Sequence, residues 1–328
     1  MPAVPAYAIL VVLAIAAVAI GTSLWRTGRS GFQRFDVPLA VVPGAEDYDR
    51  AYRRRTLISL AAGIVVFCAV LALNEAVSSA YGVVIALAPG AAATVALVIF
   101  GALSRLRASE PAGTRSADLV PRAPRDYIPR WGLALPAIAA VISIAFYVAA
   151  GLSSRPDETG LYRAIGFELV HGQDRYGSAA TPYPGWYYGL PLIAMTLALV
   201  AATVFALYRI AGAPRPTMPS LREVDDRARV MSTRVVMKVS SGALLTYFGA
   251  ILATAGTTTV TAATFWNIRD AEGTDQILVQ PAATIGAIEA AGGGVIVLVG
   301  LALLFLAVRD AAWVPTSSSI AVRTKIRA

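Results

Sequence analysis

The residue whose type and setting could do chemistry is Glu289, a carboxylate inside the long apolar run of residues 282–308. Charged side chains within a membrane span are rare, usually face protein or a water-filled cavity, and are candidates for functional sites. Glu289 lies about seven residues from one end of the run, roughly 10 Å deep at the rise of an α-helix. A carboxyl group at this depth could carry a proton, bind a cation or donate a hydrogen bond.

Hydroxyl groups in the preceding apolar run, residues 239–265, are the expected neighbours of Glu289. The two runs form a hairpin, and a similar depth in the earlier run falls near Thr258 and Thr259, with Thr254 about one turn away. A polar contact between Glu289 and these threonines would form a candidate intramembrane site. Hydroxyls that bond to carbonyls of their own helix would instead serve only as contacts between helices. The sequence leaves both interpretations open.

The pair Pro89 and Gly90 lies inside another apolar run, residues 81–103. Proline removes a helical hydrogen bond and clashes with the preceding turn, so we expect a helix kink at this point. Transporters use broken helices at their substrate sites, whereas ordinary bundles also contain proline kinks. The pair is therefore a candidate kink and not by itself a binding site.

Few residues of this sequence could support metal, cofactor or covalent chemistry. The chain has a single cysteine, Cys68, and a single histidine, His171, which excludes an internal disulfide and sites that need two histidines. Glu168 and His171 would share a face if they lay on a helix, but a metal site needs three or four such ligands. No phosphate-binding loop and no HExxH motif occur. We therefore predict no cofactor, no metal site and no enzymatic activity.

Long apolar segments must position these side chains. The 328 residues are 57% hydrophobic and 15% charged, and soluble domains carry about 25% charged residues. A membrane-spanning helix needs about 20 mostly apolar residues. Seven runs meet this requirement: 7–25, 57–73, 81–103, 131–152, 186–208, 239–265 and 282–308. We predict an all-α fold, a single integral membrane bundle of seven transmembrane helices over residues 1–328 without a soluble domain.

The distribution of basic residues predicts the orientation of the bundle. Of the 28 Lys and Arg residues, 24 fall on one side of the predicted spans and four on the other. Basic loops stay in the cytoplasm, which places the N-terminus outside and the C-terminus in the cytoplasm. All five Trp residues lie at or just beyond the ends of spans, where aromatic belts form. We expect a multi-pass protein of a bacterial cytoplasmic membrane.

The predicted cytoplasmic loops are expected to contact lipid. Their arginine clusters would attract anionic lipid headgroups, and the uneven distribution of charge argues against a nucleic-acid partner. One of these loops contains apolar residues at helical spacing: Leu221, Val224, Ala228, Met231 and Val235. We expect a helix here, either along the inner leaflet or continuing into the sixth span, with Arg222, Asp225, Asp226 and Arg229 away from the apolar stripe.

Two function classes follow from these features. The first is a non-enzymatic membrane-embedded component that assembles with an unidentified protein partner, because no connection has room for a catalytic or energy-coupling domain. The second is a stand-alone secondary transporter or channel built on Glu289 and the threonine-rich sixth span. A membrane enzyme is the least favoured class, since the sequence shows no catalytic constellation.

Overall fold

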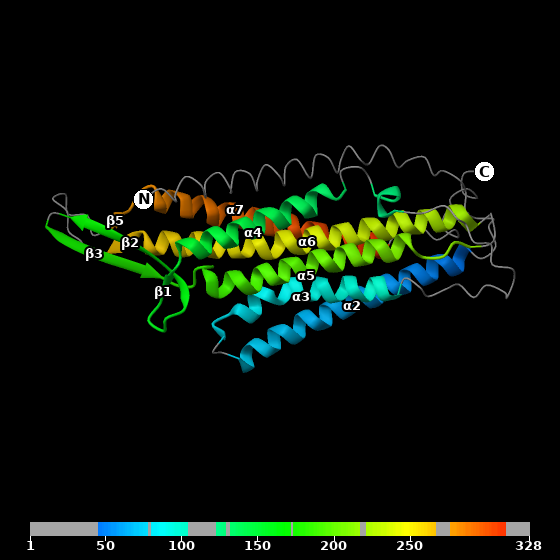
Figure 1. The fold of residues 1–328 in the computed structure, drawn as a ribbon, viewed down its shortest axis with the longest axis horizontal. Coiled ribbons are helices and arrows are strands. Elements are labelled where there is room, and N and C mark those ends of the chain that lie inside the picture. Colours follow the sequence, from blue (N-terminus) through cyan, green and yellow to red (C-terminus); the bar gives the residue numbers. More distant parts are fainter. Residues whose placement is uncertain are drawn as a thin grey trace, which may run out of the picture.

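The computed structural model describes residues 45–77, 80–103, 123–128, 132–171, 173–216, 221–266 and 276–312. Within these ranges, six helices are long and apolar enough to cross a membrane. They are α2 (Ala45–Ala76), α3 (Val83–Ala102), α4 (Ala134–Ser153), α5 (Trp186–Ala211), α6 (Arg222–Ala262) and α7 (Ala282–Ala312), and they run side by side in one bundle (Figure 1). They match the six predicted spans from residue 57 onward. The first predicted span, residues 7–25, lies outside the described residues.

Helix α6 is the centre of the bundle. It is 41 residues long, and 83% of the residues in its apolar stretch are buried, against 17% in the apolar stretch of α2. It contacts α2, α3, α4, α5 and α7. The apolar stripe of residues 221–235 therefore belongs to a helix that continues without a break into the sixth predicted span, from Arg222 to Ala262.

Small residues allow α6 and α7 to approach closely along their length. A Cβ atom added to Gly256 would lie 2.3 Å from the backbone nitrogen of Ala290, and one added to Gly293 would lie 2.4 Å from that of Ala253. Neither position has space for a side chain, because the atoms in the way are backbone atoms. Close backbone approach through small residues is typical of membrane helices, whose association depends on packing. This α6–α7 seam places the turns around Gly256 and Ala290 against each other.

Strands extend beyond one end of the bundle, which corrects the all-α prediction. β1 (Arg155–Pro156), β2 (Tyr162–His171) and β3 (Asp174–Ala180) form an antiparallel sheet in the order β1-β2-β3, and β4 (Thr264–Trp266) pairs with β5 (Gln276–Leu278). The β2–β3 hairpin projects past the helices (Figure 1). Since Glu168 and His171 lie on a strand, where successive residues alternate between faces, they do not share a face as they would on a helix.

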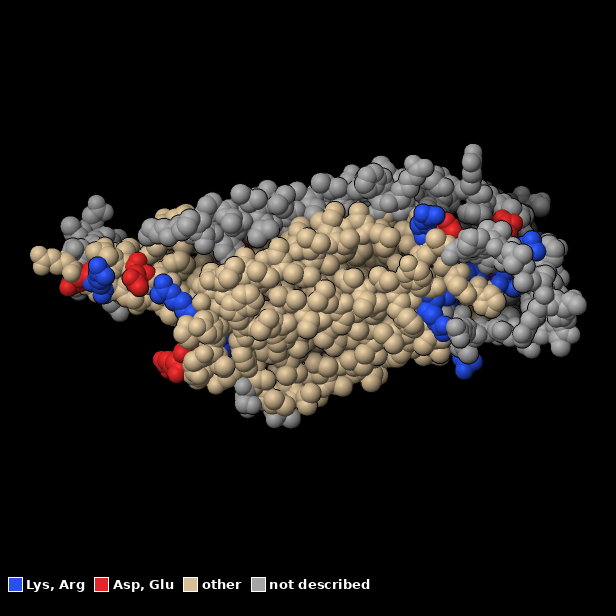
Figure 2. All heavy atoms as spheres, viewed as in Figure 1, with Lys and Arg blue, Asp and Glu red and all other residues tan. Residues whose placement is uncertain are grey.

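Charged residues gather at the two ends of the bundle. On the face shown in Figure 2, the acidic and basic residues lie toward the ends, and a broad apolar surface separates them. We call the end at which α2 and α6 begin and α5 and α7 finish the basic end, and the opposite end the hairpin end. The short 3-10 helix η5 (Pro124–Asp126) lies against α5. This arrangement suits helices that cross an apolar layer between two polar surfaces.

Candidate functional site

Glu289 is a buried carboxylate beside the α6–α7 seam. Only 4% of the residue is exposed. It follows Gly286 by three residues and precedes Gly293 by four, and both glycines contact the backbone of α6. Among the described residues, no hydrogen bond or ion pair reaches its carboxyl group. A buried ionised carboxylate without a partner is costly, so this group is a candidate for binding a proton or a cation.

The three threonines expected near Glu289 differ in their burial and in their hydrogen-bond partners. Thr258 donates a hydrogen bond from Oγ1 to the backbone oxygen of Pro182 at 2.6 Å, whereas Thr254 is exposed and donates to Ala250 of its own helix at 2.9 Å. Thr259 is buried on the stretch of α6 that lies opposite the α7 turn from Gly286 to Ala290. The structure thus brings Thr259 to the level of Glu289 and gives the other two hydroxyls backbone partners.

Pro89 and Gly90 lie where α3 packs on α5. Helix α3 continues through Pro89 from Val83 to Ala102. A Cβ atom at Gly90 would lie 2.5 Å from Cγ of Met195, so glycine is needed for this close contact. The pair therefore has a packing role in the structure, and the expected kink stays a prediction. Helix α5 also contains an internal proline, Pro191, which the sequence analysis did not single out.

Hydroxyl groups buried in the middle of the bundle join α5 to α6. The hydroxyls of Thr196 and Tyr247 are hydrogen-bonded, and so are those of Thr203 and Ser240, at 2.8 Å. Both threonines also donate to carbonyls one turn earlier in α5. Such bonds hold membrane helices together. The sequence analysis missed them, although threonine and tyrosine side chains inside apolar runs were the available signal.

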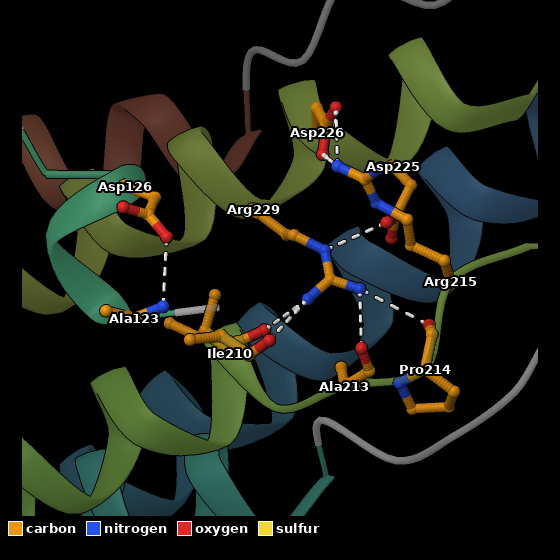
Figure 3. Close-up of polar contacts among 10 residues, drawn as sticks. Ala123, Asp126, Ile210, Ala213, Pro214, Arg215, Asp225, Asp226 and Arg229 are labelled. Atoms are coloured by element: carbon orange, nitrogen blue, oxygen red, sulfur yellow. Dashed lines mark hydrogen bonds and ion pairs between the residues drawn. The ribbon is translucent and has the colours of Figure 1, made fainter. Parts of the chain in front are cut away.

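A fully paired charge network lies at the basic end (Figure 3). Arg229 is 3% exposed, and its Nε donates to a carboxylate oxygen of Asp225 at 2.8 Å. Its two remaining nitrogens donate to four backbone carbonyls at and after the end of α5, those of Ile210, Ala211, Ala213 and Pro214. The last carbonyls of a helix have no partner within the helix. Arg229 supplies that partner and fixes the end of α5 to α6.

Two further ion pairs extend this network. Arg215 donates to Asp226 at 2.9 Å, and Lys238 of α6 pairs with Asp310 of α7. The sequence analysis placed Asp225 and Arg229 off the apolar stripe, but it did not predict that both are buried. Their spacing of four residues was a usable signal, since such pairs meet on one helix face.

The hairpin end has its own anchor at Asp157. The Asp157 carboxylate accepts hydrogen bonds from the backbone and side chain of Thr159, from the backbone of Leu161 and from Arg163. These bonds, with the Thr159 hydroxyl first, lower the pKa of Asp157 from 3.8 to about 2. The Arg163 guanidinium lies 3.6 Å from the ring centre of Tyr81, which precedes α3. The start of the hairpin is therefore fixed to the helices.

Comparisons with protein-family models, with curated proteins and with solved structures find no match for this chain. Its function is consequently argued from its own residues.

Proposed function

We propose that the chain is a non-enzymatic component of a larger assembly, embedded by its helices in a bacterial cytoplasmic membrane, and that the β2–β3 hairpin binds the partner protein. The projection of this hairpin beyond the bundle is the observation that carries the proposal (Figure 1). Residues of β3 from Asp174 to Gly177 are all exposed.

The hairpin has the properties of a protein-binding strand. In the described part of the chain, β3 pairs with β2 along one edge and with nothing along the other. A free strand edge can pair with an extended segment of another protein. Exposed large side chains near this edge include Val170 at 64% and Tyr176 at 36%. The anchor at Asp157 and Arg163 holds the hairpin in place, which lowers the entropic cost of binding.

A shortened hairpin tests this function. Phe167 pairs with Ser178, so joining these two residues through an Asn-Gly turn removes the tip and keeps the remaining register. The matched control keeps the full hairpin and replaces Glu158, an exposed residue between β1 and β2, by Gln. A partner should be recovered in stoichiometric amount with the wild-type chain and with Glu158→Gln in mild detergent, and lost with the shortened hairpin. Equal recovery with all three chains, or no stoichiometric partner at all, would contradict the proposal.

The same proposal includes an orientation, with the basic end in the cytoplasm. It is supported by the excess of Lys and Arg in the predicted cytoplasmic loops. Reporter fusions at Glu110 and Arg175 should report opposite sides of the membrane. Activity of both reporters on one side would contradict the orientation.

A second candidate function, a secondary transporter or channel, is favoured by the buried carboxyl group of Glu289, which has no hydrogen-bond or ion-pair partner within the described ranges. In proteoliposomes, wild-type chain should then conduct protons or a cation, and Glu289→Gln should abolish this flux. Glu168→Gln is the matched control, because Glu168 is exposed on β2 outside the helices. Flux that is absent from the wild type, or equal in both variants, would exclude this candidate.

A further inference from the structure

A second arginine at the basic end, the half-buried Arg55, differs from Arg229 in its partners. Its guanidinium lies 4.1 Å from the ring centre of Phe100 in α3. Its Nη2 donates a hydrogen bond to Oγ of Ser232 in α6 at 2.5 Å. Arg55 itself belongs to α2, so three helices meet at this side chain. These contacts hold the guanidinium in one position, unlike the charged end of a solvent-exposed arginine.

The charge of Arg55 has no acidic counterpart. Among the described residues, no ion pair includes Arg55, and its charged neighbour is another cation, Arg229. The carboxylate in the vicinity, Asp310, is already paired with Lys238. Since Arg229 is itself paired with Asp225, the unbalanced charge among the described residues is that of Arg55, and an anion is the group that would balance it.

Two hydrogen-bond donors, one on Arg55 itself and one on Tyr52, have no acceptor among the described residues. Nε of Arg55 and the hydroxyl of Tyr52 are buried without a hydrogen-bond partner in the described part of the chain. Tyr52 is 6% exposed, and its ring centre lies 5.8 Å from the Arg55 guanidinium. Nearly all buried donors in proteins are paired, so two such donors on neighbouring side chains of α2 point to an acceptor that the described residues do not supply. The Ser232 hydroxyl, which accepts from Arg55, can donate its own proton to the same acceptor.

We propose that Tyr52, Arg55 and Ser232 form a binding site for the phosphate group of an anionic lipid headgroup, between α2 and α6. A phosphate offers several acceptor oxygens, and arginine binds it through more than one nitrogen. The site lies just before the apolar run of residues 57–73, which is the level at which headgroups meet a membrane helix. A free phosphate has the same chemistry, so the test must separate the two sources.

Binding of a named lipid to the detergent-purified full chain tests the site. Native mass spectrometry would follow titration with phosphatidylglycerol, with zwitterionic phosphatidylcholine as the reference lipid. Arg55→Gln should weaken binding of phosphatidylglycerol about tenfold. The matched control is Arg54→Gln, which removes the same charge from the exposed neighbouring residue and should change the affinity less than about twofold. Equal losses in the two variants would show diffuse attraction and overturn the site.

A second variant keeps the test valid if Arg55→Gln does not fold. Tyr52→Phe retains every charge and removes one donor, so it should weaken binding of phosphatidylglycerol about threefold. Parallel titration with inorganic phosphate separates the sources: phosphate binding that depends on Arg55, without lipid binding, would keep the site and replace its ligand. Equal affinity for the two lipids would refute the anionic headgroup. Absence of both lipid and phosphate binding in the wild type would overturn the proposal altogether.

Discussion

Arg229 of α6 and Glu289 of α7 are both buried residues with ionisable side chains, but their surroundings are opposite. Arg229 donates to one carboxylate and four backbone carbonyls. Glu289, 4% exposed, has no polar partner among the described residues. A buried charge that is fully paired holds structure together, whereas an unpaired one is expensive to keep. The difference marks Arg229 as a structural residue and Glu289 as the place to look for function.

The largest effect should come from breaking the paired region. Arg229→Met removes the hydrogen bonds to the end of α5 and leaves Asp225 buried without its partner. We expect the free energy of unfolding to fall by about 3–5 kcal/mol. Unfolding in mixed detergent micelles measures it, with Arg222→Met, an exposed arginine of the same helix, as the control. A loss as small as that of the control would mean that the network contributes little.

The next largest loss of stability should come from a substitution in the closely packed α6–α7 seam beside Glu289. Gly293→Ala would place Cβ 2.4 Å from the backbone nitrogen of Ala253, whereas a Cβ at the adjacent Gly294 meets no atom of the described residues within 4 Å. Gly293→Ala should therefore lower the free energy of unfolding by about 1–3 kcal/mol. Gly294→Ala should be neutral or stabilise the helix by up to about 1 kcal/mol. Similar unfolding curves for the two variants would show that α6 and α7 are not held at this distance.

Changing a carboxylate to an amide compares the two regions directly. Glu289→Gln breaks no described interaction, so the free energy of unfolding should stay within about 1 kcal/mol of the wild type or rise. Asp225→Asn weakens the ion pair with Arg229 and should cost about 1–3 kcal/mol. Both are measured by the same detergent unfolding assay. If Glu289→Gln costs as much as Asp225→Asn, Glu289 has a structural role and the contrast between the two regions fails.

The smallest effect concerns the anchor of the hairpin. The pKa of Asp157 is about 2 in the folded chain against an ordinary value of 3.8. Its ionised form therefore stabilises the anchor above the ordinary pKa, and this contribution is lost as the pH falls toward the folded value. Amide hydrogen exchange at Thr159 and Leu161, corrected for intrinsic rates, should show protection that decreases over this range. Asp157→Asn should have less protection at neutral pH and no such decrease, and an unchanged pH profile would contradict the assignment.

The helices could be predicted from the sequence, whereas the hairpin could not. The length of an apolar run is a local property that directly reports whether a helix can cross a membrane, and each predicted span from residue 57 onward matches a helix. The stretch from Tyr162 to Ala180 lies between two predicted spans, was assigned no strand, and forms β2 and β3. Strand formation depends on which segment lies alongside, and the sequence of one short segment does not specify its neighbour.

In the candidate site, too, some features follow from the local sequence and others depend on how the helices pack. Residue spacing along the chain places Glu289 deep in an apolar run and puts Arg229 and Asp225 on one helix face. Tertiary structure decided their partners. Contact between Gly256 and Ala290 sets the rotation of α6 against α7, and Thr258 bonds to Pro182 instead of facing Glu289. The end of α5 brings its carbonyls to Arg229. Burial depth follows from local hydrophobicity, but the pairing of charges depends on helix rotation, which only the packing of whole helices specifies.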